Sequence, residues 1–424
     1  MYRFIHHKFN YFILLGLILS LFIFSSPSTS ISFQSQYYSP QTAEIRGVWL
    51  TNVSSGVLFM PWGINRALNQ LSAFKFNTVY PVVWNRGHTF YKSHLLKQEI
   101  GIETQPLIGI MHGGKDILAT IAKLASQKKL RVIPWFEYGL MLPAQSELAI
   151  HHPDWLTTQL SGDELVDDTL HNVQTNTPKP SFWQQLISIT TPKKQVWLNP
   201  LHPEVKDFIK GLILEVVTNY DIDGIQLDDH FGMPVKLGYD SFTSGLYQQE
   251  HQGKNPPSDP FDPEWMRWRA DQITILMQEI VRAVRNVKPN IKISLSPNSH
   301  RFSYKHYLQD WDTWVKTGLV DELVLQVYRS DKNSFLAELS QPEVQNARQT
   351  IPVSVGILTG IWTNPVNIQQ ITEQVKVVRE QNFNGVSFFY WESLWSYMTP
   401  DSPKQRRKAF LELFPVAEKK IQED

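Results

Sequence analysis

Two adjacent carboxylic acids, Asp228 and Asp229, are the residues of this chain whose types and spacing most clearly suggest chemistry. They end a short apolar stretch, from Ile222 to Leu227, whose β-prone residues predict a buried strand. A carboxylate inside a buried strand is costly unless it is paired. At the carboxyl end of a parallel strand, however, barrels and open α/β folds carry their active sites. The pair therefore favours acid–base catalysis over a loop cap or an ion pair with a nearby Arg or Lys.

Alternation along the strand predicts where the first acid points, because successive side chains face opposite sides of a sheet. Ile225 and Leu227 share the face that should pack on surrounding helices. Gln226 and Asp228 share the other face, which should look into a barrel mouth. Asp229 follows at the transition to the loop and could turn into the same mouth.

The elements that must position these acids alternate between β-prone and helical runs, which predicts an α/β protein with a (β/α)8 TIM barrel. Besides the stretch that ends in the two acids, strands are expected at residues 44–51, 77–84, 131–137, 291–298, 319–328, 352–358 and 385–392. Helices are expected near residues 64–75, 114–129, 203–219, 263–287, 304–317, 334–348, 367–381 and 403–413. Long loops follow the third and fourth strands, at 138–202 and 232–262, and the second is long enough to be a lid.

The two ends of the chain suggest where in the cell the protein is located. Residues 1–30 combine basic residues with an apolar run, as in a signal peptide or an N-terminal anchor. A linker at 31–43, a single catalytic barrel at 44–415 and a polar tail at 416–424 are expected to follow. The protein should therefore lie outside the cytoplasm, in the periplasm or cell envelope, with membrane contact only through its N-terminal segment.

Composition excludes several classes of function. The formal net charge is +0 with no basic patch, so nucleic acid is not expected as a partner. The absence of cysteine excludes disulfides, thiolate catalysis and cysteine-based zinc sites. No histidine–carboxylate spacing typical of a metal site is recognisable, and no metal or cofactor is expected. The 14 Trp, 15 Tyr and 23 Phe residues suit a core and also stacking on sugar rings.

The carboxyl ends of the predicted strands supply further candidates, which in a barrel would surround the acid pair. Glu137 and Glu392 are additional catalytic candidates. Amides and acids bind hydroxyl groups, aromatic rings stack on sugars, and paired carboxyls perform acid–base work, so such a ring suits a polyhydroxylated substrate. The substrate-binding candidates are Trp135, Arg86, His230, Asn298, Gln326, Tyr328, Tyr390 and Trp391.

Several of these candidates have an ordinary structural alternative. Glu137 could form an ion pair with Arg131 or Arg86. Glu392 could anchor the last loop, and His230 could be a simple loop histidine. Trp135 and Trp391 could pack in the barrel rather than carry sugar.

Several blocks of this chain resemble a glycosyl-hydrolase-like family, family ten, whose members are bacterial envelope proteins with a (β/α)8 barrel. The resemblance rests on residues 44–50, 135–136, 197–200, 202–205, 221–231 and 294–297 and covers about residues 44–395. It implies hydrolysis of glycosidic bonds, notably in peptidoglycan glycan strands stripped of peptide, and carries the family's Asp-Asp pair to Asp228 and Asp229. Many relatives have Asn where this chain has Glu137, which could give this protein a second carboxylate of its own.

The expected function is therefore a glycoside hydrolase of an extracytoplasmic, N-acetylhexosamine-containing glycan. One acid of the pair would be the general acid, with its pKa raised by its charged neighbour. The other acid could assist through the acetamido group, or Glu137 or Glu392 could be the partner. Two alternatives remain: a non-catalytic glycan-binding envelope protein, and a hydrolase of an α-glucan or exopolysaccharide.

Overall fold

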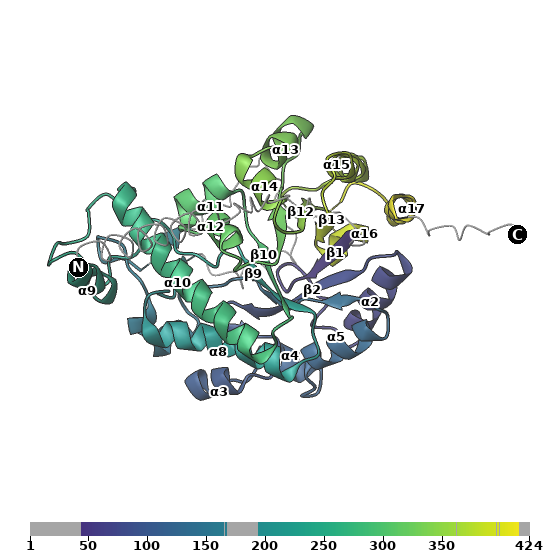
Figure 1. Cartoon of the computed structure of the whole chain (residues 1–424). Coiled ribbons are helices and arrows are strands. Elements are labelled where there is room, and N and C mark those ends of the chain that lie inside the picture. The colour runs from purple at the N-terminus through teal and green to yellow at the C-terminus, as the bar shows by residue number, and fades with distance from the viewer. Residues whose placement is uncertain are drawn as a thin grey trace, which may run out of the picture. The chain divides into compact units, whose positions relative to one another are not determined.

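The computed structural model describes residues 44–164, 166–167, 194–361, 363–395, 397 and 399–414. The expected signal or anchor segment, linker and polar tail (1–30, 31–43 and 416–424) lie outside the described residues. Eight parallel strand positions form a closed TIM barrel, because β1 (Ile45–Leu50) pairs with both β2 (Thr78–Asn85) and β13 (Gly385–Phe389) (Figure 1). Between β2 and β13 the barrel consists of β4 (Arg131–Val132) with β5 (Trp135–Phe136), β9 (Gly224–Asp228), β10 (Lys292–Ser296), β11 (Glu322–Gln326) and β12 (Val353–Leu358).

Helices surround the strands, as the sequence predicts (Figure 1). Three predicted helices have the observed bounds: α8 (Pro203–Asn219), α10 (Pro263–Val287) and α17 (Pro403–Leu413). Each begins with proline, whose missing N–H needs no partner in the first turn. The remaining helices before β11 are α2 (Gly63–Ala73), α3 (His94–Ile100), α4 (Pro106–Met111), α5 (Ile117–Ser126), α6 (Glu147–His151), the 3-10 turn η1 (Pro153–Trp155), α9 (Ser241–Glu250), α11 (His300–Tyr307) and α12 (Trp311–Lys316). After β11 come α13 (Lys332–Leu339), α14 (Pro342–Ala347), α15 (Ile368–Glu380) and α16 (Trp391–Trp395).

Two helices predicted as continuous are each divided in two. The prediction at 304–317 becomes α11 and α12, because Leu308 adopts a left-handed conformation with φ of 54° that ends the first helix. The prediction at 334–348 becomes α13 and α14, because Pro342 cannot continue a helix and begins a new one. Among the described helices, none is both long enough and apolar enough to cross a membrane.

The third barrel strand is also interrupted, between β4 and β5. Pro134 lies in the gap and has no N–H to donate to a neighbouring strand. The pairing register of β5 with β2 shifts between Val82 and Trp84. The predicted continuous strand at 131–137 is therefore two short pieces, and Glu137 follows the second.

The two predicted long loops both carry structure. After β5, the strands β6 (Met141–Pro143), β8 (Lys194–Trp197) and β7 (Val166–Asp167) form a small antiparallel sheet, and β3 (His88–Thr89) forms a hairpin with the end of β2. After β9, the segment suggested as a lid contains α9. The fully buried Arg269 of α10 donates to the backbone carbonyls of Val235, Leu237 and Pro260 at 2.5–2.7 Å. These bonds tie the segment to α10, so it is held rather than free.

The barrel interior is filled by aromatic rings and by one glycine that makes room for them. Trp49 lies 5.2 Å from Tyr80 and 6.1 Å from Trp135, measured between ring centroids. A Cβ on Gly47 would lie 2.5 Å from both the Ser387 Oγ and a ring carbon of Tyr80. A larger residue at this position would therefore push on two strands at once.

Gly47→Ala is expected to destabilise the barrel by about 1–3 kcal/mol, the usual cost of overpacking. Chemical denaturation measures the free energy of unfolding. Gly245→Ala is the matched control, because nothing lies within 4 Å of a Cβ there and the residue sits inside α9, where alanine is favoured. Equal stability of both variants would contradict the described packing.

Candidate active site

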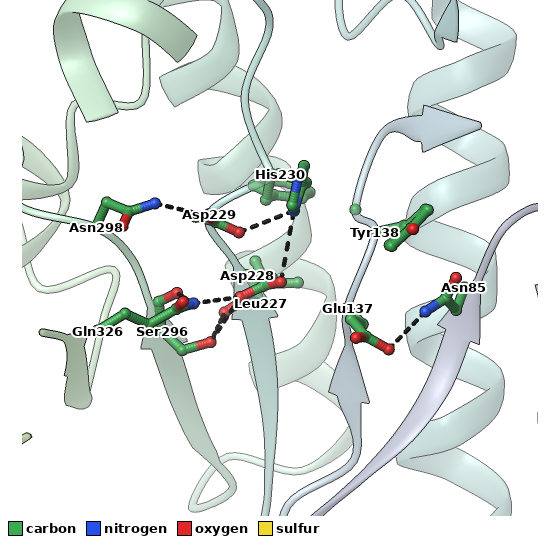
Figure 2. Close-up of polar contacts among 12 residues, drawn as sticks. Asn85, Glu137, Tyr138, Leu227, Asp228, Asp229, His230, Ser296, Asn298 and Gln326 are labelled. Atoms are coloured by element: carbon green, nitrogen blue, oxygen red, sulfur yellow. Dashed lines mark hydrogen bonds and ion pairs between the residues drawn. The ribbon is translucent and has the colours of Figure 1, made fainter. Parts of the chain in front are cut away.

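The site is built at the carboxyl ends of six neighbouring strands, from β1 round to β11, where polar side chains replace the aromatic interior. Figure 2 shows the polar side chains at the ends of β2, β5, β9, β10 and β11. Gln226, one inward position below the end of β9, accepts a hydrogen bond from the Trp49 Nε1 across the barrel at 2.8 Å. This contact confirms that Gln226, and with it Asp228, faces the interior. The side chains of the polar layer are Thr51, Asn85, Glu137, Asp228, Ser296 and Gln326.

Glu137 is buried at the end of β5 and is held by two neutral donors. Thr51 donates to its carboxyl group at 2.9 Å and Asn85 at 2.5 Å. Burial raises the pKa of Glu137 to about 7, although these two hydrogen bonds and the nearby Arg86 oppose the shift. A carboxyl group with such a pKa exchanges protons near neutral pH, which suits acid–base catalysis.

Asp228 lies on the strand next to Glu137. The register pairs Phe136 with Leu227, so the residues that follow on each strand end side by side. The Asp228 Oδ1 accepts from the Ser296 Oγ at 3.0 Å and from the Gln326 Nε2 at 2.9 Å (Figure 2). Burial and then the charge of Asp229 raise the pKa of Asp228 well above its usual value. Asp228 is therefore a carboxyl group that tends to keep its proton.

Asp229 turns toward the same mouth and is held from two sides. The Asn298 Nδ2 donates to its Oδ2 at 2.6 Å, and the His230 Nδ1 lies 2.8 Å from its Oδ1. The same Nδ1 is 3.6 Å from the Asp228 Oδ2. Burial alone would lower the pKa of His230, but the two aspartates outweigh it and raise that pKa well above its usual value. The raised pKa favours the protonated imidazole, which pairs with the Asp229 carboxylate.

Asp228, Asp229 and His230 also have the spacing of a possible metal site. One ligand atom from each lies within 4.8 Å of the others. A metal, however, needs a lone pair on the ring nitrogen, and protonation of the nitrogen that faces both aspartates removes that lone pair. Metal binding at this triad would therefore first have to displace a proton from a histidine whose pKa is raised.

Three aromatic residues surround His230. The rings of Tyr138, Trp197 and Tyr307 lie 5.6, 6.1 and 6.2 Å from the imidazole. The backbone also closes in, because the Leu140 N donates to the His230 carbonyl at 3.2 Å. Gly139 has a φ of +51°, and a Cβ there would lie 2.6 Å from that carbonyl oxygen. Only glycine leaves room for this approach of the two loops.

The structure brings several predicted residues to the acids. Asn298 and Gln326 bind the two aspartates directly, as described above. Tyr328 has a pKa raised by burial and then by the carboxylates of Asp228, Asp229 and Glu137, so it lies within their electrostatic reach. Arg86 lies 5.8 Å above the Tyr138 ring. Trp135 is buried and packs against Trp49 and Phe389, contacts that correspond to its packing alternative.

The candidates that follow β13 have contacts to a different part of the mouth, the loop after β1. The Glu392 Oε1 accepts from the Ser55 Oγ at 2.5 Å and from the backbone N–H groups of residues 56 and 57 at 3.0 and 3.1 Å. The Tyr390 hydroxyl donates to the Ser54 carbonyl at 3.2 Å. Trp391 is buried at the start of α16. Glu392 therefore anchors this loop through one of its two oxygens.

Sequence reasoning did not select Thr51, Asn85 or Tyr138 as site residues, whereas it placed Ser296 at the end of a predicted strand without adding it to the substrate-binding candidates. Thr51 and Asn85 lie at or directly after the ends of predicted strands and face inward, so position and alternation could have indicated them. Their partners could not be deduced, because the bond from Thr51 to Glu137 joins residues that are 86 positions apart. Tyr138 lies in a loop, where no periodic pattern fixes the direction of a side chain.

Comparisons with a family model and with known proteins all indicate glycosyl hydrolases or glycosyl-hydrolase-like proteins. The family described as Glycosyl hydrolase-like 10 matches residues 44–378. Glycosyl hydrolase YngK of Bacillus subtilis is 23% identical over an alignment of 356 residues that covers 75% of this chain and 59% of that protein. Glycosyl hydrolase DigH of Escherichia coli is 23% identical over an alignment of 337 residues that covers 67% of this chain and 65% of that protein. This chain thus spans less than two thirds of the length of either relative.

Among solved structures, the glycoside hydrolase domain of PgaB (BpsB) from Bordetella bronchiseptica superposes with a TM-score of 0.55. The match covers 85% of this chain and 100% of that domain at 12% sequence identity. At this low sequence identity the similarity is evidence for the fold alone. That fold agrees with the barrel described above.

Proposed function

Because the chain belongs to the glycosyl hydrolase-like 10 family, we propose that it hydrolyses glycosidic bonds in an N-acetylhexosamine-containing glycan outside the cytoplasm, with peptidoglycan glycan strands as the expected substrate. The observation that carries this proposal is the pairing of two buried carboxyl groups, Asp228 and Glu137, on neighbouring strand ends. Glycosidases need one carboxyl group that holds a proton and another that can carry charge.

In the proposed reaction, Asp228 donates its proton to the glycosidic oxygen as the leaving sugar departs. Its burial beside Asp229 supports this role, because both raise its pKa. Glu137, in its ionised form, stabilises the positive charge that develops on the anomeric carbon. A water molecule then adds to the anomeric carbon: its hydroxyl group becomes that of the new reducing end, and its remaining proton restores Asp228.

Asp229 has a supporting role in this scheme. The ion pair with His230 and the bond from Asn298 hold its carboxylate in place next to Asp228. A fixed negative charge there makes loss of the Asp228 proton unfavourable. The residues that could meet the sugar are the amides and aromatic rings around the acids, among them Asn298, Gln326 and Tyr328.

The substrate proposal rests on the family and on the expected route of the protein out of the cytoplasm. The partner would be a polysaccharide, and the N-terminal segment would either be removed or anchor the protein to the membrane. No part of the proposed reaction depends on nucleic acid or on a cofactor.

A panel of glycans tests this proposal. The purified protein is incubated with peptide-free peptidoglycan strands, chitin oligomers and an α-glucan, and the products are read by mass spectrometry. The proposal expects shorter fragments from the peptidoglycan strands. Cleavage of the α-glucan alone would shift the assignment to an exopolysaccharide hydrolase. Intact strands that co-sediment with the protein would indicate a glycan-binding protein.

A further inference from the structure

A cavity of about 690 Å³ lies beside the acids, between the loops that follow β1, β2 and β13. Its volume falls in the range of small-molecule sites, roughly 300–1,000 Å³. Asn85 connects it to the active site, because this side chain lines the cavity while its Nδ2 donates to Glu137. Glu392 and Asn52 line the cavity from the loops after β13 and β1.

Three residues that line this cavity each have a buried side-chain oxygen atom without a hydrogen-bond partner among the described residues. These atoms are the Asn52 Oδ1, the Asn85 Oδ1 and the Glu392 Oε2. Glu392 shows the contrast within one side chain, since its Oε1 accepts three hydrogen bonds and its Oε2 none from the described part of the chain. A buried acceptor left without a partner destabilises the site, and a bound donor would remove that cost.

The chemistry of the lining defines the missing ligand. All three unpartnered atoms are acceptors, so the ligand must present O–H or N–H groups. Arg86 also lines the cavity and can only donate, so the ligand must combine donors with acceptors, as hydroxyl groups do. The wall also contains the rings of Phe59, Phe90 and Tyr397, and sugar rings combine donor groups with C–H faces that pack on such rings.

We propose that this cavity is a sugar-binding subsite, in which Asn52, Asn85 and Glu392 accept hydrogen bonds from the hydroxyl or amino groups of a glycan residue next to the bond that is cut. Glu392 is the specificity-determining residue of this subsite rather than a catalytic one. The subsite deepens the proposed function, because its position relative to the cut bond rests on the assignment of Glu137 and Asp228 as the reacting acids.

Glu392→Gln is a sharp test, because the two oxygens of Glu392 have different environments. In the variant, the amide oxygen can keep the three bonds to the loop after β1. The amide nitrogen then takes the place of the unpartnered Oε2, so a donor stands where an acceptor is needed. Binding of a glycan should weaken about tenfold or more, since one hydrogen bond is replaced by a donor–donor conflict.

Calorimetry measures this binding to the full chain with Asp228→Asn as background, so that no substrate is cut. The probes are the N-acetylglucosamine tetramer and its de-N-acetylated counterpart. Asn52→Ala is the second variant and should weaken binding in the same direction. Glu343→Gln is the matched control, because the Glu343 Oε2 is also buried and without a partner in the described chain but lies on α14, outside the cavity.

The expected result is weaker binding of at least one tetramer in the Glu392 and Asn52 variants and unchanged binding in the control. The tetramer that loses more affinity identifies the donors as hydroxyl or amino groups. Unchanged affinity in both cavity variants, or no binding of either tetramer by the parent protein, would overturn the subsite. If binding depends on Glu392 but the wild-type protein cuts no glycan, the subsite stands and the proposed reaction fails.

Discussion

Asp228→Asn is expected to lower kcat for glycan cleavage by about a thousandfold, within the range attributed to a positioned general acid. The asparagine can still accept the bonds from Ser296 and Gln326 through its Oδ1, so the shape of the site is kept. What it lacks is the proton that the leaving oxygen needs. Initial rates on a soluble glycan, together with glycan binding and Tm, measure the effect.

The matched control for Asp228→Asn substitutes an aspartate at the other end of the same strand. Asp223 immediately precedes β9, and its Oδ2 accepts from the Val132 N at 2.8 Å. Asp223→Asn changes the same chemical group on the side of the barrel away from the mouth, so its kcat should stay near that of the wild type. If both variants lost activity equally, or if Asp228→Asn kept it, Asp228 would not be the acid.

Glu137→Gln is expected to lower kcat by about a hundredfold and to change its pH dependence. In the wild type, kcat/KM should rise with pH through about 7, because Glu137 must be ionised to stabilise positive charge and burial holds its pKa at about 7. At higher pH the rate should fall as Asp228 loses its proton. The glutamine variant should lack the rising limb, and a rising limb that survives the substitution would contradict the assignment.

The same group links pH to stability. The pKa of Glu137 is raised on folding from 4.5 to about 7, so the native state favours the protonated form. The contribution of Glu137 to the free energy of unfolding is therefore fully present below pH 4.5 and is lost as the pH rises through about 7. For a shift of this size the loss is about 3 kcal/mol. Glu137→Gln carries no charge and should lose less stability between acid and mildly alkaline pH. Thermal unfolding of both proteins at several pH values measures the difference.

The barrel was predictable because its signals are local and repeated. Proline at the first position and an apolar stripe set the bounds of α8 and α10, and alternation placed Gln226 and Asp228 on the inner face. Errors arose where one residue overrides a pattern. Leu308 ends α11 in a left-handed conformation, and Pro134 breaks the third strand, although the surrounding periodicity continues.

The candidate site was predictable in part. Acids and amides at strand ends indicated Asp228, Asp229, Asn298 and Gln326, and these residues do lie together. How the site residues are distributed around the barrel mouth depends on which loops meet there. Contacts between residues that lie far apart in the sequence decide which loops meet. Glu392 binds the loop after β1, 337 residues away from Ser55. No local pattern near residue 392 carries that information.

The most direct measurement is the mass balance of a single cleavage. A peptide-free peptidoglycan strand of defined length is treated with the wild-type protein and with Asp228→Asn, and the fragments are weighed by mass spectrometry. Hydrolysis by the proposed acids predicts pairs of fragments whose masses sum to that of the parent strand plus one water, and no such pairs with the variant. An unchanged strand, fragments that sum to the parent mass without water, or equal cleavage by the variant would contradict the account.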